Sequence, residues 1–161
     1  MVGMTDADPS RLVVLVRHAK AESGEEGADH DRRLTDRGER NAREAGRWLP
    51  AVVPQVAEVW CSSATRAVQT WTAMSQALPT APDTSVERAL YLADAREIAE
   101  RLAARTSGAG NAPGAVVVVG HNPTMEQLQA LLTGELRGMR PGAVAVVDLD
   151  RHALVDSWSP A

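Results

Sequence analysis

Two stretches decide the fold of this chain: LVVLVRH at residues 12–18 and AVVVVGHNP at residues 115–123. Each is a short, Val-rich apolar run that ends in a histidine, and such runs are typical of strands buried on both faces of a parallel sheet. Ligands of open α/β sheets bind in the crevice at the carboxyl ends of the strands. We therefore expect His18 and His121 to meet in one crevice. Arg17, next to His18, indicates that the ligand is an anion.

The chain as a whole has the composition of a soluble globular protein, with 161 residues, of which 44% are hydrophobic and 24% charged. We expect residues 1–10 to form a flexible N-terminal tail and residues 11–161 to form a single domain. The net charge of −4 argues against partners such as nucleic acid or an anionic membrane surface. No stretch resembles a signal peptide or reaches the roughly 20 apolar residues that span a bilayer. Because Cys61 is the single cysteine, no internal disulfide can form, and a cytoplasmic location is expected.

Strands are expected to alternate with helices along the chain. Helix starts are indicated at Thr35, at Ser62 or Ser63, at Asp94, and at Pro123 or Thr124, and Pro50 is expected to end the first helix. Strands are expected at residues 12–17, 56–61 and 115–119, with a closing pair at 143–149 and 153–158, a possible short strand within 86–92, and loops at 19–33 and 106–114. This alternation predicts an α/β fold, a three-layer α/β/α sandwich around a mostly parallel central sheet.

The ends of the three buried strands carry side chains that suit a phosphoryl group. The first strand leads to Arg17 and His18, the second to Ser62, Ser63 and Arg66, and the third to His121. Guanidinium groups match phosphate oxygens in a bidentate way, and helix N-termini offer free N–H groups. A neutral histidine can attack phosphorus and become a phosphohistidine. Because no carboxylate cluster lies near either histidine in sequence, we expect no metal and no cofactor.

Three motifs, in this order, resemble the signature of the histidine phosphatase superfamily, which has the phosphoglycerate-mutase-like fold: VRHA at residues 16–19, SSATRAVQT at 62–70 and VGHNP at 119–123. The short chain, together with DRRLTDRG at residues 31–38, is most similar to the small SixA-type phosphohistidine phosphatases. The resemblance implies that residues 11–161 form a single histidine phosphatase domain.

The resemblance also implies a role for each site residue. His18 would be the nucleophile, and the phosphate oxygens would be bound by Arg17, Arg32 and Arg66. His121, in its protonated form, would donate to the same phosphoryl group. Arg33 and Arg37 compete with Arg32 for its role. Structural or surface positions are expected for the remaining candidates, namely Ser62 as a helix cap, Cys61 as a small buried side chain, and His30 and His152 as surface residues.

The proton donor for the leaving group is the main departure from the family pattern. Larger members of the superfamily place a Glu or Asp between the second and third motifs, and this chain offers Glu87, Asp94 and Glu97 there without a matching context. An alkoxide leaving group needs a general acid, which contributes about 10²–10⁴-fold to the rate. The imidazole of a phosphohistidine leaves far more easily. The absence of a clear acid therefore favours phosphohistidine over sugar phosphates.

The expected function is that of a metal-independent phosphatase that hydrolyses phosphohistidine in a partner protein through a covalent phosphohistidine on His18. Two alternatives stay open at this point. One is a phosphatase of small phosphate esters that uses Glu87, Asp94 or Glu97 as its acid. The other is a catalytically weak phosphate-binding interaction module on the same fold.

Overall fold

The computed structural model describes residues 8–23, 29–107 and 113–161. Within these ranges, six strands form one sheet in the order β3-β2-β4-β1-β5-β6. The strands are β1 (Leu12–Arg17), β2 (Val56–Ser62), β3 (Asp83–Glu87), β4 (Ala115–Gly120), β5 (Val144–Asp148) and β6 (Ala153–Trp158). The helices are α1 (Asp36–Val52), α2 (Thr65–Ser75), α3 (Arg88–Leu92), α4 (Ala95–Ser107) and α5 (Thr124–Thr133), with short 3-10 turns η1 (Pro9–Arg11) and η2 (Asp29–Asp31).

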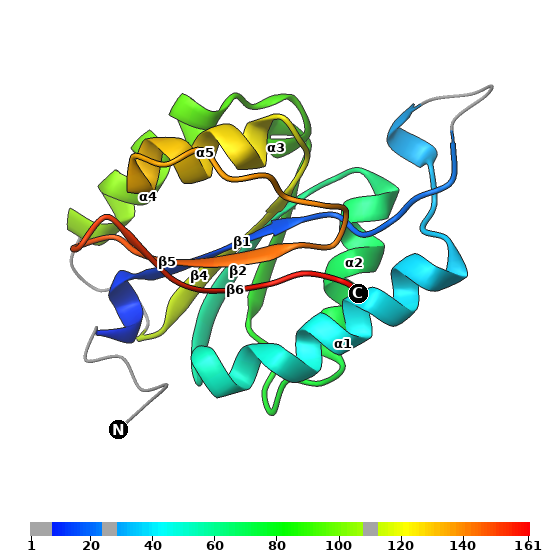
Figure 1. Ribbon diagram of the computed structural model, residues 1–161, viewed down its shortest axis with the longest axis horizontal. Coiled ribbons are helices and arrows are strands. Elements are labelled where there is room, and N and C mark those ends of the chain that lie inside the picture. Colours follow the sequence, from blue (N-terminus) through cyan, green and yellow to red (C-terminus); the bar gives the residue numbers. More distant parts are fainter. Residues whose placement is uncertain (1–7, 24–28, 108–112) are drawn as a thin grey trace.

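The helices cover both faces of this sheet, with α1 and α2 on one side and α3, α4 and α5 on the other (Figure 1). Strands β1 and β4 are neighbours, and the pairs β1–β4, β2–β4 and β2–β3 are parallel. Strands β5 and β6 add an antiparallel edge next to β1. The predicted three-layer sandwich with a mostly parallel sheet is confirmed.

Strand β1 shows why an unbroken apolar run was needed at the centre of the sheet. Val14 and Val16 pack in the cluster that includes α1 and α2, whereas Val13 and Leu15 pack in the cluster that includes α4 and α5. All four side chains are 0% exposed. Successive side chains of a strand point to opposite faces, so a strand with helices on both sides needs apolar residues at every position.

Helix α1 begins as predicted, because the Thr35 hydroxyl accepts a hydrogen bond from the Gly38 N–H (3.0 Å). The prediction that Pro50 ends the helix is wrong by two residues. The N–H of Val53 donates to the carbonyl of Leu49 (2.8 Å), so a further turn closes after the proline. Proline removes only its own donor, and this loss is tolerated close to the C-terminus of the helix.

The predicted start of α4 is confirmed as a reciprocal cap. The Asp94 carboxylate accepts from the N–H of Glu97 (2.9 Å), and the Glu97 carboxylate accepts from the N–H of Asp94 (3.1 Å). The start predicted for α2 is wrong, since its cap position is Ala64 and neither neighbouring serine serves as the N-cap. The hydroxyls of Ser62 and Ser63 bond instead to histidines described below.

Three predicted boundaries shift. Residues 86–92, expected as a possible strand, contain the end of β3 and then α3. Helix α4 continues to Ser107, into the predicted loop 106–114, of which residues 108–112 lie outside the described ranges. Of the predicted tail, residues 1–7 also lie outside these ranges, and Pro9–Arg11 form η1, capped by the Asp8 side chain.

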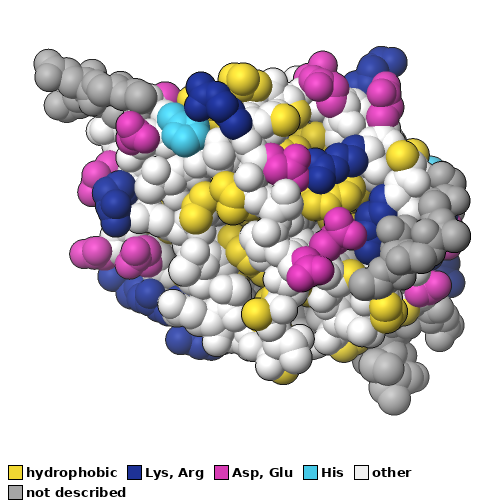
Figure 2. Space-filling model, turned by 180° about the vertical axis from the view of Figure 1, so that it is seen from behind, with side chains coloured by type: hydrophobic (Ala, Val, Ile, Leu, Met, Phe, Trp, Pro, Cys, Tyr) yellow, Lys and Arg dark blue, Asp and Glu magenta, His cyan; other side chains and the backbone are white. Residues whose placement is uncertain are grey.

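Among the described helices, none is long and apolar enough to cross a membrane. On the face seen in Figure 2, acidic and basic side chains are interspersed and do not separate into regions of one sign.

Candidate active site

A pocket of about 240 Å³ lies at the carboxyl ends of β1 and β4, beside the first turn of α2. The five side chains that the sequence singled out, His18, Arg17, Arg32, Arg66 and His121, all line it. The remaining lining residues are Lys20, Ala21, Asn122 and Pro141. The described lining therefore contains four basic side chains and two imidazoles but no carboxylate, which is a composition suited to an oxyanion.

His18 is buried (8% exposed) and has both ring nitrogens in hydrogen bonds. Nδ1 lies 2.8 Å from the carbonyl oxygen of Ala19, which can only accept, so Nδ1 carries the proton. The Nε atom of Arg66 donates to Nε2 (3.2 Å), so Nε2 presents its lone pair. Burial lowers the pKa of His18 to about 3, so the ring is neutral at neutral pH. The side chain is thus a neutral imidazole whose Nε2 electron pair accepts the hydrogen bond from Arg66.

Arg66 connects His18 to the η2 turn. Its side chain is buried, its Nη1 donates to the Asp29 carbonyl (2.8 Å), and its Nη2 donates to the Asp29 carboxylate (3.0 Å). These bonds fix the far end of the guanidinium while Nε stays directed at His18. A phosphate bound in front of His18 would meet this fixed edge.

Asp29 is a site residue that sequence reasoning missed. Its carboxylate accepts from Tyr91 Oη (2.7 Å), from Arg66, and from Arg32 Nε (2.9 Å). The hydrogen bond from Tyr91, together with those from the two arginines, lowers the pKa of Asp29 to about 2. The available signal was the spacing of Asp29 and Arg32, because residues three apart meet within one turn. The contacts with Arg66 and Tyr91 depend on the fold.

His121 lies beside His18, with the ring centroids 5.2 Å apart. Its Nε2 is 2.7 Å from the Ser62 hydroxyl, which already accepts from the Ala64 N–H (3.2 Å). The direction of the Ser62–His121 hydrogen bond depends on which ring nitrogen of His121 carries the proton. Within the part of the chain that the structure describes, Nδ1 has no hydrogen-bond partner.

That a protonated His121 donates to a bound phosphoryl group stays a prediction, and in the free pocket the ring is neutral. Burial, followed by the positive charge of Arg66, lowers the pKa of His121 to about 4. The ring is thus neutral near pH 7. A bound dianion would oppose these effects and favour protonation.

The other two arginines hold the flanks of the pocket. Arg17 is half-buried, and its Nη1 donates to the Met139 carbonyl (2.8 Å). Arg32 donates to Asp29 and, through Nη1, to the Glu22 carbonyl (3.1 Å). Arg33 and Arg37, the competitors of Arg32, are exposed and do not line the pocket.

The three acid candidates have other partners. Glu87 forms a two-point ion pair with Arg101 (2.8 Å for each oxygen), which lowers the pKa of Glu87. Asp94 and Glu97 cap α4, as described above. None of these three carboxylates is part of the described lining of the pocket.

His30 was expected on the surface, and this expectation is wrong. The side chain is half-buried, Nε2 lies 2.8 Å from the Ser63 hydroxyl, and the ring packs edge-on against Tyr91, which in turn packs against His121. By contrast, His152 is exposed. Cys61 is completely buried, and burial raises the pKa of its thiol to about 12, so it is an inert core residue, as expected.

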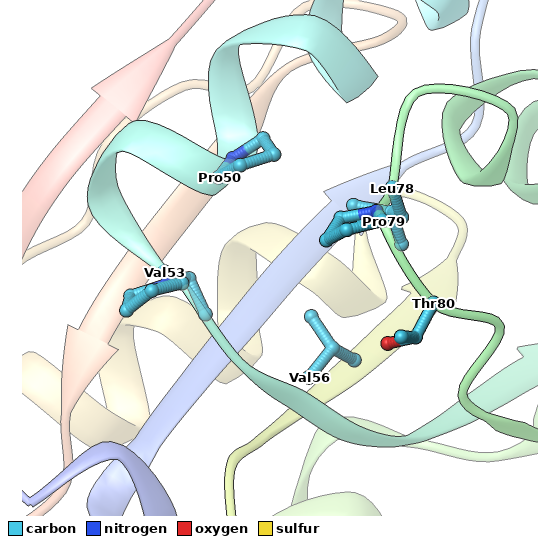
Figure 3. A pocket seen from close by; sticks show the side chains of 7 residues that line it. Pro50, Val53, Val56, Leu78, Pro79 and Thr80 are labelled. Atoms are coloured by element: carbon cyan, nitrogen blue, oxygen red, sulfur yellow. The ribbon is translucent and has the colours of Figure 1, made fainter.

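A second hollow lies at the opposite ends of the strands, where α1 ends and β2 begins (Figure 3). It is about 10 Å³ in volume and is lined by Pro50, Val53, Pro54, Val56, Leu78, Pro79 and Thr80. This space holds about one water molecule and no ionisable side chain. It is a packing defect and not a candidate site.

Comparison with known proteins agrees with this geometry. Residues 13–91 match the histidine phosphatase superfamily (branch 1). SixA from Agrobacterium tumefaciens has 29% identity and a TM-score of 0.81, covering 94% of this chain and 99% of that one. A protein histidine phosphatase SixA complexed with tungstate has 26% identity and a TM-score of 0.78, covering 92% and 96%.

An uncharacterised protein of Mycobacterium tuberculosis is 40% identical over 117 residues, which cover 73% of this chain and 69% of that protein. Together with the site and the fold, these matches establish the family. The chain belongs to the SixA-like branch of the histidine phosphatase superfamily.

Proposed function

We propose that the protein hydrolyses phosphohistidine in a partner protein through a covalent phosphohistidine on His18. One observation carries this proposal: the neutral Nε2 of buried His18 faces a pocket lined by Arg17, Arg66 and His121. A neutral, unprotonated nucleophilic nitrogen is thereby placed among the charges that a transferred phosphoryl group needs.

In the first step, the electron pair of His18 Nε2 attacks the phosphorus atom of the substrate. The bond from phosphorus to the substrate imidazole breaks, and that ring leaves as neutral imidazole because its other nitrogen carries a proton. The incoming phosphoryl group takes over the hydrogen bond that Arg66 Nε donates to His18 Nε2, and Arg17 and His121 stabilise the charge on the oxygens during the in-line transfer. The Nδ1–H of His18 donates to Ala19 throughout and disperses the positive charge on the ring.

In the second step, water attacks the phosphorus of phospho-His18. The P–Nε2 bond breaks, His18 returns to its neutral form, and inorganic phosphate is released. The leaving group in this step is again an imidazole, so both halves of the cycle have the same chemistry.

The positions of the acid candidates support phosphohistidine as the substrate. Glu87 is held by Arg101, Asp94 and Glu97 cap α4, and Asp29 has a pKa of about 2. Glu87 and Asp29, whose pKa values are lowered, are poor proton donors near neutral pH, and Asp94 and Glu97 are not part of the described pocket lining. An ester with an alkoxide leaving group would lack the proton that its departure needs.

The test measures phosphate release from a histidine-phosphorylated protein in the presence of a chelator, without added metal. Wild type should turn over, and His18→Ala should lose about 10³-fold or more in rate because the nucleophile is gone. His152→Ala is the matched control, because this histidine is exposed and lies outside the pocket. Full turnover by His18→Ala, or strict dependence on Mg²⁺, would contradict the mechanism.

A panel of phosphate esters separates the substrates. Phosphohistidine protein should have a higher kcat/KM than every ester in the panel, since only its leaving group departs without an acid. A higher kcat/KM for an ester would assign the protein to ester hydrolysis. Binding of phosphate without any turnover would assign it to a phosphate-binding module.

A further inference from the structure

The segment after α5 is attached to the pocket by a carboxylate that lies outside the pocket lining. Glu126 is in the first turn of α5, and its Oε2 accepts two hydrogen bonds, from the backbone N–H of Met139 and from Asn122 Nδ2 (both 2.8 Å). Met139 is 4% exposed. Glu126 Oε2 therefore holds the buried N–H of Met139 next to Asn122, a residue of the third motif.

The carbonyl of the same residue, Met139, bonds to Arg17. The carbonyl of Met139 accepts from Arg17 Nη1 (2.8 Å) and from Asn122 Nδ2 (3.0 Å). Asn122 thus bridges Glu126 and the Met139 carbonyl, and the carbonyl in turn orients the guanidinium. Within the described residues, the Nε atom of Arg17 has no hydrogen-bond partner. The hydrogen bond from Nη1 to the Met139 carbonyl therefore orients this guanidinium in the pocket.

The backbone next to this contact is already tied to β1. The N–H of Gly142 donates to the carbonyls of Arg17 and His18, and the N–H of Arg17 donates to the carbonyl of Ala143. These bonds set the path of the segment at residues 142 and 143 but leave the peptide at Met139 to side-chain contacts. Glu126 supplies the contact to the N–H of Met139, and Asn122 supplies one of the two contacts to its carbonyl.

We infer that Glu126 is a positioning residue: acting through Asn122 and Met139, it sets the orientation in which Arg17 meets the phosphoryl group. This inference rests on the proposed function, in which Arg17 binds phosphate. Two properties of Glu126 can be separated by substitution, namely its reach and its charge. Glu126→Gln keeps the reach and an acceptor oxygen, whereas Glu126→Asp keeps the charge but is one methylene too short to hold both donors.

The experiment measures the dissociation constant for tungstate, used as the oxyanion probe, together with kcat and KM. Glu126→Asp and Glu126→Ala should weaken tungstate binding about 10-fold and raise KM more than they lower kcat. Glu126→Gln should stay within about twofold of wild type, because the clamp is geometric. Glu135→Gln is the matched control, since this carboxylate is exposed and pairs with exposed Arg137 in the same segment.

A double-mutant cycle with Arg17→Ala shows whether Glu126 acts through Arg17. In the Arg17→Ala background, Glu126→Asp should cause no further loss of tungstate affinity, because the group it positions is absent. An equal loss in both backgrounds, or wild-type affinity for Glu126→Asp combined with a loss for Glu126→Gln, would overturn the inference. If Arg17→Ala alone leaves tungstate affinity unchanged, the proposed phosphate site itself is wrong. Thermal unfolding of every variant identifies any that fails to fold, and the Gln–Asp pair then still decides the question.

Discussion

At the scale of single residues, the protonation of His18 and His121 follows from their burial. The pKa values are about 3 and about 4, against about 6.5 for an imidazole in water. Both rings should therefore stay neutral in the free protein down to about pH 5. Histidine ring signals followed by NMR should show this, with the urea-unfolded protein as the reference that titrates near 6.5. A midpoint near 6.5 for His18 in the folded protein would contradict the assignment of a buried neutral nucleophile.

These lowered pKa values also make stability depend on pH. Between about pH 6.5 and pH 3 the unfolded chain binds more protons than the folded one, so the free energy of unfolding falls as the pH falls. The contribution is complete above about pH 6.5 and is lost progressively below it, by up to about 1.4 kcal/mol per pH unit for each histidine. Urea unfolding from pH 7 to pH 4.5 measures the slope. His121→Gln should reduce the slope by about half, and an unchanged slope would show that His121 does not contribute.

The contribution of the Asp29 carboxylate to stability is also lost as the pH falls, but at a lower pH than that of the histidines. Its pKa is lowered to about 2 in the folded protein, so its contribution to stability is present above about pH 4 and is lost as the pH falls toward 2. Asp29→Asn should therefore lower the melting temperature at pH 7, and by only about half as much at pH 3. The pH dependence separates a lost ion pair from a lost side-chain contact, because a packing defect would lower the melting temperature equally at both pH values.

At the scale of elements, α1 and α2 approach each other through a glycine. A Cβ placed on Gly46 would lie 2.2 Å from the carbonyl oxygen of Met74, a backbone atom that cannot move aside cheaply. Gly46→Ala should therefore destabilise the protein by about 1–3 kcal/mol, although alanine is the better helix former. Glu44→Ala, at an exposed position of the same helix, should change stability by less than about 0.5 kcal/mol. A more stable Gly46→Ala protein would show that the two helices can separate without loss.

Elements with a strong local signal were predictable from the sequence. Strands β1 and β4 are unbroken apolar runs, and the caps of α1 and α4 lie at the predicted Thr35 and Asp94. The prediction for α2 was wrong because a serine hydroxyl can serve a helix or a distant partner equally well. Ser62 bonds to His121, which arrives on another strand, and no local pattern contains that information.

The residues of the candidate site that lie within the three sequence motifs were predictable. His18, Arg66 and His121 follow strands or open helices, so their meeting follows from the topology of the sheet. Asp29 was missed because Arg66, which donates to it, is remote in sequence. Glu126 was missed because it reaches Arg17 only through the backbone of Met139. Contacts of that kind are fixed by the path of the loops, which amino-acid spacing does not encode.

At the scale of the whole molecule, the two edges of the sheet differ from its centre. Strand β3 has exposed side chains and pairs with β2 alone, whereas β4 is buried and lies between β1 and β2. Amide hydrogen exchange should therefore be fastest in β3 and slowest in β1 and β4. Mass spectrometry of exchanged peptides checks this order. Protection of β3 equal to that of β4 would indicate that another chain covers this edge in solution.

The in-register pairing of β1 with β4 places Arg17 opposite Gly120, and the two histidines follow directly. A slip of one residue between these strands would turn His18 to the opposite face of the sheet. Oxyanion binding therefore reports whether β1 and β4 are paired in the native register. During refolding, binding should return only after this pairing has formed, even if the helical circular dichroism signal returns earlier. Purified protein that binds tungstate is, by the same argument, protein whose central sheet is correctly aligned.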